Sequence, residues 1–201
     1  GMDVSNASLY DGASAAIEAV LMCRAATRRS HRVVVAGTVH PEYREVMETY
    51  LRELDCDLVV VDSEDEVVSP AAIEAALDEQ TACLVLQHPN FFGCLEDMES
   101  LVATAKSFDV QVVQIFDPIS LGVLKRPGDL GVDVAVAEGQ SLVNPLLYGG
   151  PYLGILACRE SFMRRMPGRI AGQTVTDSDR RCWVLTLQTR EQHIRRDLSL
   201  I

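Results

Sequence analysis

Residues 32–61 read RVVVAGTVHPEYREVMETYLRELDCDLVVV, and they contain two apolar runs on either side of an amphipathic segment. The runs at 32–36 and 57–61 are continuous rather than alternating, which is typical of strands buried on both faces of a sheet. After Pro41, apolar side chains recur at the helical spacing of positions 43, 46, 47, 50, 51 and 54. A strand, a helix and a second strand over this length predict a βαβ unit with parallel strands.

The same alternation continues on both sides of this unit. We expect a mostly apolar helix that begins near Gly12, a helix at 71–77 opened by Ser69 and Pro70, and a helix at 96–108. Further strands are expected at 82–86, 110–116, 132–137 and 153–157, and further helices at 160–166 and 185–196. The predicted class is α/β, with helices covering a mixed, mostly parallel sheet.

Length and composition favour one domain over residues 1–201, because 48% hydrophobic content over this length supports a single sizeable core. The net charge of -11, with 18 Lys and Arg residues, argues against a nucleic-acid surface and against an anionic membrane as partner. We find no apolar run of about 20 residues and no cleavable leader, so a cytoplasmic location is expected.

The six cysteines and four histidines are scattered along the chain, and no two cysteines form a C-x-x-C pair. Structural metal sites need closely spaced ligands of this kind. The sequence therefore predicts no metal site, and free, mostly buried thiols.

Candidate functional residues follow the apolar strands, because ligands in open α/β sheets bind beyond the carboxyl ends of the strands. These positions are Gly37-Thr38-Val39-His40, His88-Pro89-Asn90, Asp117-Pro118 and Glu138-Gly139-Gln140-Ser141. The segment Gly12-Ala13-Ser14 at a helix start has two interpretations. Its amides and the helix dipole suit a phosphate, and its small side chains equally suit close packing.

Asp117 and the lysines bear on one particular cofactor. A carboxylate at the end of an apolar strand is costly without a partner, and the protonated ring nitrogen of pyridoxal phosphate is one such partner. A turn or capping role before Pro118 is the alternative. A covalently held pyridoxal also needs an amine in a later loop, yet the only lysines are Lys106, within a predicted helix, and Lys125, in a polar turn.

Five segments, in order along nearly the whole chain, carry a family resemblance. They are 6–13 (NASLYDGA), 40–46 (HPEYREV), 89–93 (PNFFG), 149–154 (GGPYLG) and 187–196 (LQTREQHIRR). Together they resemble the glycine decarboxylase P-protein family, and are similar to the alpha-type subunit, or subunit 1, of its two-subunit bacterial form.

The resemblance implies a fold-type I pyridoxal phosphate-dependent transferase, with an aspartate aminotransferase-like large domain that is a portion of a longer subunit. It implies glycine decarboxylation and aminomethyl transfer to a lipoyl carrier protein, carried out with a beta-type subunit that holds the pyridoxal phosphate. This chain then carries no covalently bound cofactor and is inactive alone. Alternatives left open are an assembly or regulatory protein without activity, a small phosphate- or nucleotide-binding module, and a homodimer in isolation.

The resemblance also assigns residues. Ser141 stands at the position of the Schiff-base lysine, Gln140 at the preceding histidine, and Gly37 at the cofactor-stacking histidine. Together with Gly12, Ala13, Ser14 and Asp117, Gln140 and Ser141 would form a vestigial cofactor pocket. Residues expected to face the partner are Tyr148, Gly149, Gly150, Arg190, His193 and Arg195, although the last three also suit a solvated helix.

Overall fold

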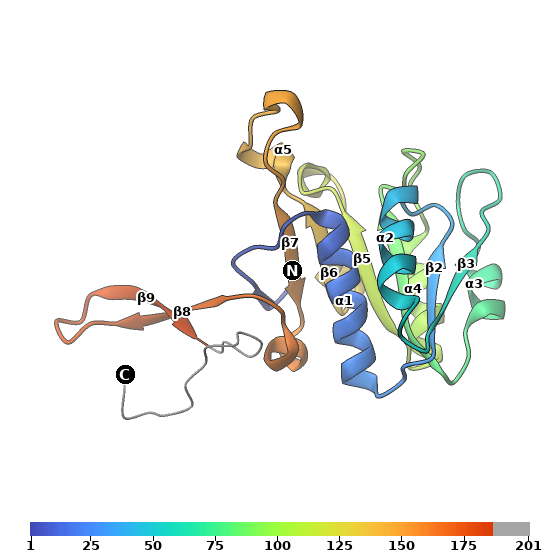
Figure 1. The fold of residues 1–201 in the computed structure, drawn as a ribbon, viewed down its shortest axis with the longest axis horizontal. Helices are drawn as coiled ribbons and strands as arrows, with labels where there is room; N and C mark the ends of the chain where they lie inside the picture. The colour runs from blue at the N-terminus through green and yellow to red at the C-terminus, as the bar shows by residue number, and fades with distance from the viewer. Residues whose placement is uncertain (187–201) are drawn as a thin grey trace.

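The computed structural model describes residues 1–186, which form a seven-stranded sheet with helices on both faces and a separate two-stranded ribbon (Figure 1). The strands are β1 (Val4–Ser5), β2 (Arg32–Ala36), β3 (Asp57–Val61), β4 (Thr81–His88), β5 (Gln111–Phe116), β6 (Val134–Glu138), β7 (Gly154–Cys158), β8 (Ile170–Val175) and β9 (Arg181–Thr186). The α-helices are α1 (Gly12–Thr27), α2 (Pro41–Leu51), α3 (Pro70–Ala76), α4 (Met98–Ser107) and α5 (Gln140–Val143). Short 3-10 helices are η1 (Ile119–Gly122), η2 (Pro127–Leu130), η3 (Leu147–Gly149) and η4 (Glu160–Arg165).

The large sheet has the order β1-β7-β6-β5-β4-β2-β3. Strands β2 to β6 are parallel to their neighbours, whereas β7 pairs antiparallel with β6 and β1 antiparallel with β7. Helices α1 and α2 lie on one face, and α3 and α4 cover the other (Figure 1). The prediction of a mixed, mostly parallel α/β sheet is confirmed.

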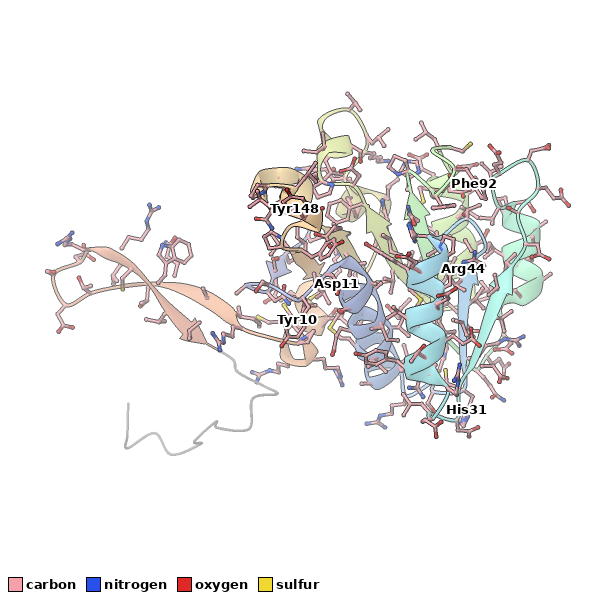
Figure 2. The ribbon with its side chains drawn as sticks, turned by 45° about the horizontal axis from the view of Figure 1, so that its top comes forward. Tyr10, Asp11, His31, Arg44, Phe92 and Tyr148 are labelled. Carbon is pink, nitrogen blue, oxygen red and sulfur yellow. The ribbon has the colours of Figure 1, made fainter. Side chains whose placement is uncertain are left out.

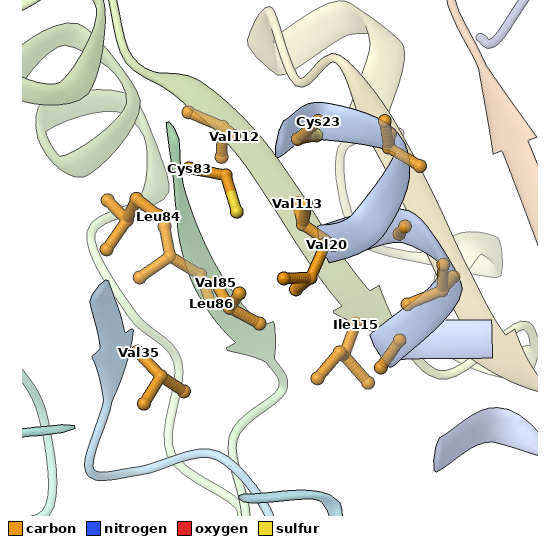
Figure 3. Close-up of a cluster of buried hydrophobic side chains, with 14 of the residues drawn as sticks. Val20, Cys23, Val35, Cys83, Leu84, Val85, Leu86, Val112, Val113 and Ile115 are labelled. Carbon is orange, nitrogen blue, oxygen red and sulfur yellow. The ribbon is translucent and has the colours of Figure 1, made fainter. Parts of the chain in front are cut away.

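The core lies between α1 and the central strands (Figure 3). Val33, Val35, Val113 and Val20 have no exposed surface. Each fully buried side chain of this size stabilises the fold by roughly 1.5–3 kcal/mol relative to an exposed one. The continuous apolar strands are thus explained by burial on both faces of the sheet.

Local capping explains where the helices start. Asp11 Oδ1 accepts a hydrogen bond from the Ser14 amide at 2.7 Å at the start of α1. The predicted start of α3 is confirmed, since Ser69 Oγ accepts from the Ala72 amide at 3.2 Å and Pro70 occupies the first turn.

Two sequence expectations need correction, and one short strand was missed. Strand β1 was not predicted, because two residues carry no periodic signal. The segment expected as a helix at 160–166 is the 3-10 helix η4. The expected helix at 185–196 is wrong at its first two residues, which belong to β9 and pair with Ala171 and Ile170 of β8. The local helical pattern there is overridden by cross-strand pairing, and residues 187–196 lie outside the described part.

The described chain also bears on partners and ligands. None of the helices within residues 1–186 is both long enough and apolar enough to cross a membrane. Over the same residues, no three His, Cys, Asp or Glu side chains are grouped so as to hold a metal ion. All six cysteines are free, but only Cys23, Cys83 and Cys158 are buried, so the expectation of mostly buried thiols holds for half of them.

Candidate functional site

A cleft lies at the carboxyl ends of the parallel strands. The segment that begins with α5 projects from the same end of the sheet (Figure 1). The volume of the cleft is about 360 Å³. The cleft brings together three predicted residues from two strand ends, namely Asp117, Gln140 and Ser141. It also contains His40 and Glu138, which were predicted as strand-end positions without a specific role, and Tyr43 and Gln87, to which the sequence assigned no role.

A second hollow of about 330 Å³ lies at the start of α1. The predicted segment Gly12-Ala13-Ser14 lines it together with Asp11, Glu42, Tyr43, Val46, Glu138 and Tyr152. Because Tyr43 and Glu138 line both hollows, the start of α1 and the strand-end cleft form one continuous candidate site.

Asp117 is exposed, contrary to the expectation of a carboxylate at a buried strand end. Its Oδ1 accepts a hydrogen bond from the Ile119 amide at 3.0 Å, which is the geometry of a turn aspartate. Of the two interpretations of Asp117, this contact supports the turn role.

Ser141 lies in the first turn of α5 with its side chain exposed, and Gln140 Nε2 donates to the Gly149 carbonyl at 2.7 Å. Both lysines are held elsewhere by ion pairs. Lys106 pairs with Asp133, and Lys125 Nζ lies 2.7 Å from Glu99 Oε1. Neither lysine lines the cleft.

The helix start predicted as a phosphate cup is occupied by carboxylates of the chain itself. The Gly12 amide donates to Glu138 Oε2 at 2.9 Å, and the Ser14 amide and hydroxyl donate to Asp11 at 2.7 and 3.1 Å. A β-carbon at Gly12 would overlap the Tyr43 hydroxyl. Burial raises the pKa of Tyr43 to about 12, with further contributions from Glu138, Asp11 and Glu42. This arrangement does not fit an anionic phosphate, and it argues against the phosphate-binding module.

The resemblance placed the cofactor-stacking histidine at Gly37, which does not line the cleft. The histidine ring that lines the cleft belongs to His40. The His40 ring packs edge-on against Phe91 with a centroid distance of 4.8 Å, and its amide donates to Gln87 Oε1 at 2.8 Å. Gly37 instead approaches β3, where its amide donates to the Val61 carbonyl at 2.7 Å and a β-carbon would lie 2.8 Å from that oxygen. The signal for His40 was its place at a strand end directly before Pro41, at the start of a helix.

A buried polar cluster supports this wall of the cleft. The carboxylate of Glu96, which is 5% exposed, accepts hydrogen bonds from Thr38 Oγ1 at 2.7 Å, Asn90 Nδ2 at 2.8 Å and the Val68 amide at 3.0 Å. His88 Nδ1 accepts from the Glu96 amide at 3.2 Å. The cluster fixes the loop that carries Phe91 beside His40.

The segment after α5 projects from the body (Figure 1), and it exposes apolar side chains. Tyr148 is fully exposed, and Leu146 and Leu147 are 76% and 71% exposed. Figure 2 shows Tyr148 on this loop. Tyr148 also has a left-handed backbone, with φ of 52°. A strained, exposed aromatic residue on an apolar loop is typical of a contact surface.

Gly150 keeps this loop closed. Its φ is 59°, and a β-carbon there would overlap the Pro145 carbonyl oxygen. The Asn144 amide group donates to the Pro151 carbonyl at 3.2 Å across the same loop. The predicted partner-facing residues Tyr148, Gly149 and Gly150 are thus presented together, whereas Arg190, His193 and Arg195 lie outside the described residues.

The fold is that of the fold-type I group of pyridoxal phosphate-dependent enzymes. A variant of Thermus thermophilus aspartate aminotransferase superposes with a TM-score of 0.60 over 80% of this chain and 44% of its own, at 18% identity. At that identity the likeness concerns the fold alone.

The sequence identifies the family. Residues 1–199 match the model of the glycine cleavage system P-protein, and the chain belongs to that family. A relative from Desulforamulus reducens, "Probable glycine dehydrogenase (decarboxylating) subunit 1", is 53% identical over 197 residues, which are 98% of this chain and 44% of the relative. The crystal structure of a glycine decarboxylase (P-protein) of the glycine cleavage system, in inhibitor-bound form, is 42% identical with a TM-score of 0.88, over 98% of this chain and 44% of that one. The chain spans less than half the length of either.

Proposed function

We propose that this chain is the large-domain portion of a noncatalytic alpha-type subunit of glycine dehydrogenase (decarboxylating). It pairs with a beta-type subunit that holds pyridoxal phosphate, and the assembled enzyme decarboxylates glycine and passes the aminomethyl group to a lipoyl carrier protein. The family membership and the subunit 1 relative support this assignment. The cytoplasm is the proposed location.

The single observation that carries the noncatalytic role is the position of the amines. Ser141, which the family resemblance assigns to the position of the Schiff-base lysine, is exposed in the cleft, and Lys106 and Lys125 are engaged by Asp133 and Glu99 outside it. A hydroxyl cannot form the imine bond that anchors a pyridoxal aldehyde. The chain's own residues therefore serve to shape and present a surface.

The loop of Leu146, Leu147 and Tyr148 is the proposed contact with the beta-type subunit. Exposed apolar side chains on this loop would lose water-accessible surface on pairing, which favours association. The glycines at 149 and 150 let the backbone approach a neighbouring site closely. In the absence of that partner, the same surface would support a homodimer.

The test is reconstitution. We expect this chain, mixed with a beta-type subunit, lipoyl carrier protein and pyridoxal phosphate, to support glycine-dependent exchange of carbon dioxide, and neither subunit to do so alone. A full-length alpha-type subunit is the positive control. Co-purification with the beta-type subunit without exchange, while the control is active, would favour an assembly or regulatory protein instead.

A further inference from the structure

One carboxylate joins three elements at the candidate site. Glu138 is the last residue of β6, and its Oε2 accepts a hydrogen bond from the Gly12 amide of α1 at 2.9 Å. Its Oε1 accepts from the Gln140 amide at 2.9 Å and from the Leu153 amide at 2.8 Å. Gln140 and Leu153 are the two ends of the projecting loop, so a single side chain ties both ends to the start of α1.

The hydrogen bond between Glu138 and the Gly12 amide occupies a backbone donor that a phosphate bound at this helix start would need. Backbone amides at a helix start bind anions because they point outward and lie at the positive end of the helix dipole. In this chain the Gly12 amide donates its hydrogen bond to the Glu138 carboxylate, and the Ser14 amide donates to the Asp11 carboxylate. Charge-assisted bonds of this kind are stronger than those between neutral groups, so a weak external anion does not displace them.

The surroundings also oppose a second anion. Carboxylates of Asp11, Glu42 and Glu138 line the same hollow, and the Tyr43 hydroxyl lies against Gly12. A phosphate placed there would stand among three groups of its own charge, and each would repel it.

We propose that the Glu138 carboxylate is a built-in substitute for a cofactor phosphate, which closes the start of α1 to phosphorylated ligands and fixes both ends of the loop at 140–153. The link between that loop and a partner rests on the proposed function, but the substitution itself does not. Glu138 is a positioning residue, because it acts through the amides of Gly12, Gln140 and Leu153.

The first experiment compares thermal unfolding in inorganic phosphate and in chloride at equal ionic strength. We expect Glu138→Ala to lower the unfolding midpoint in chloride by roughly 5 to 10 °C, because three charge-assisted contacts are lost. Phosphate, which can then reach the vacated amides, is expected to restore part of this loss in the variant. The wild type should gain only the general stabilisation that phosphate gives to folded proteins, which is less than the gain of Glu138→Ala.

Glu45→Ala is the matched control, since it removes an exposed carboxylate of α2 that lies outside the hollow and leaves the three amide contacts in place. It should behave like the wild type. The proposal is overturned if phosphate stabilises the wild type as much as Glu138→Ala, if phosphate restores nothing to the variant, or if Glu138→Ala is as stable as the wild type in chloride.

A second pair of measurements does not depend on Glu138→Ala folding. In the wild type, the backbone amide resonance of Gly12 should not move on titration with inorganic phosphate, and a saturable movement would contradict the closure of the helix start. In Glu138→Gln, which keeps the side-chain shape, hydrogen exchange across residues 139–153 should be faster than in the wild type, and unchanged exchange would contradict the fixing of the loop. All these measurements use the chain alone, so their failure is distinct from failure of the pairing proposal.

Discussion

At the scale of single residues, the pKa of the Tyr43 hydroxyl depends on its partly buried position beside the carboxylates at the start of α1. Burial and then the nearby carboxylates of Glu138, Asp11 and Glu42 raise the pKa of Tyr43 to about 12. The folded chain keeps this proton to a higher pH than the unfolded chain does, so the stability it contributes is present below about pH 10 and is lost as pH rises toward about 12.

We predict that an absorbance titration of the tyrosines will show one phenol ionising well after the others. Tyr43→Phe should remove this late transition, whereas Tyr50→Phe, at an exposed tyrosine on the same helix, should leave it in place. Loss of the late transition in the Tyr50 variant, or its persistence in the Tyr43 variant, would show that the raised pKa does not belong to Tyr43.

His88 gives a pH dependence of the opposite kind. Burial lowers the pKa of His88, although the nearby Glu96 opposes the shift. The neutral Nδ1 accepts the Glu96 amide, so protonation removes that contact. The unfolded state takes up the proton more readily, so this stability is present above about pH 6.5 and is lost as pH falls through the lowered pKa of the folded state.

The expected result is a lower free energy of unfolding by urea at about pH 5.5 than at about pH 7.5, a range that spans the ordinary histidine pKa. His88→Asn, which keeps an acceptor that does not titrate, should show a smaller difference between the two pH values. An equal pH dependence in the wild type and His88→Asn would reject this role for His88.

At the scale of elements, the close approach of α1 and α2 depends on Gly12. Alanine normally stabilises a helix relative to glycine by roughly 0.5–1 kcal/mol. Here the added β-carbon would overlap the Tyr43 hydroxyl of α2. We therefore predict that Gly12→Ala destabilises the chain by about 1–3 kcal/mol, as overpacking does. Chemical denaturation tests this, and adding Tyr43→Phe should recover part of the loss. A stabilised Gly12→Ala variant would contradict the packing described.

The central elements were predictable because their signals are local. Continuous runs such as 32–36 and the cap at Ser69 and Pro70 need no knowledge of distant residues. The ribbon of β8 and β9 was missed because both strands are largely polar or exposed, and because the residues at 185–186 look helical in isolation. Their strand conformation comes from pairing with β8, which the local pattern does not contain.

The candidate site was only partly predictable for the same reason. Asp117, Gln140 and Ser141 were placed in one cleft by the rule for strand ends, and the structure brings them together. The role of Glu138 depends on amides 126 residues before it and 15 residues after it in the chain, a meeting that only the sheet order creates. The helix start at Gly12 was therefore predicted, but the occupation of its amides by carboxylates of the same chain was not.

At the scale of the whole molecule, the exposed loop and the body have separable roles. The Tyr148 side chain is fully exposed, so its removal costs the isolated chain little. We predict that Tyr148→Ala weakens association with a beta-type subunit by about tenfold or more, as truncation of a buried interface aromatic does, without lowering the unfolding temperature. The control is Tyr50→Ala, which removes an exposed tyrosine that lies on α2, away from the loop of Tyr148. Equal binding by both variants would place the contact elsewhere.

The most direct test of the noncatalytic role is to find which chain carries the cofactor. This chain, a beta-type subunit and pyridoxal phosphate are mixed, reduced with borohydride, and digested for mass spectrometry of the pyridoxyl-lysine peptides. We predict that the label lies on a lysine of the beta-type subunit and that Lys106 and Lys125 are unlabelled. A pyridoxyl group on either of these two lysines, at a level comparable to the partner's, would contradict this prediction.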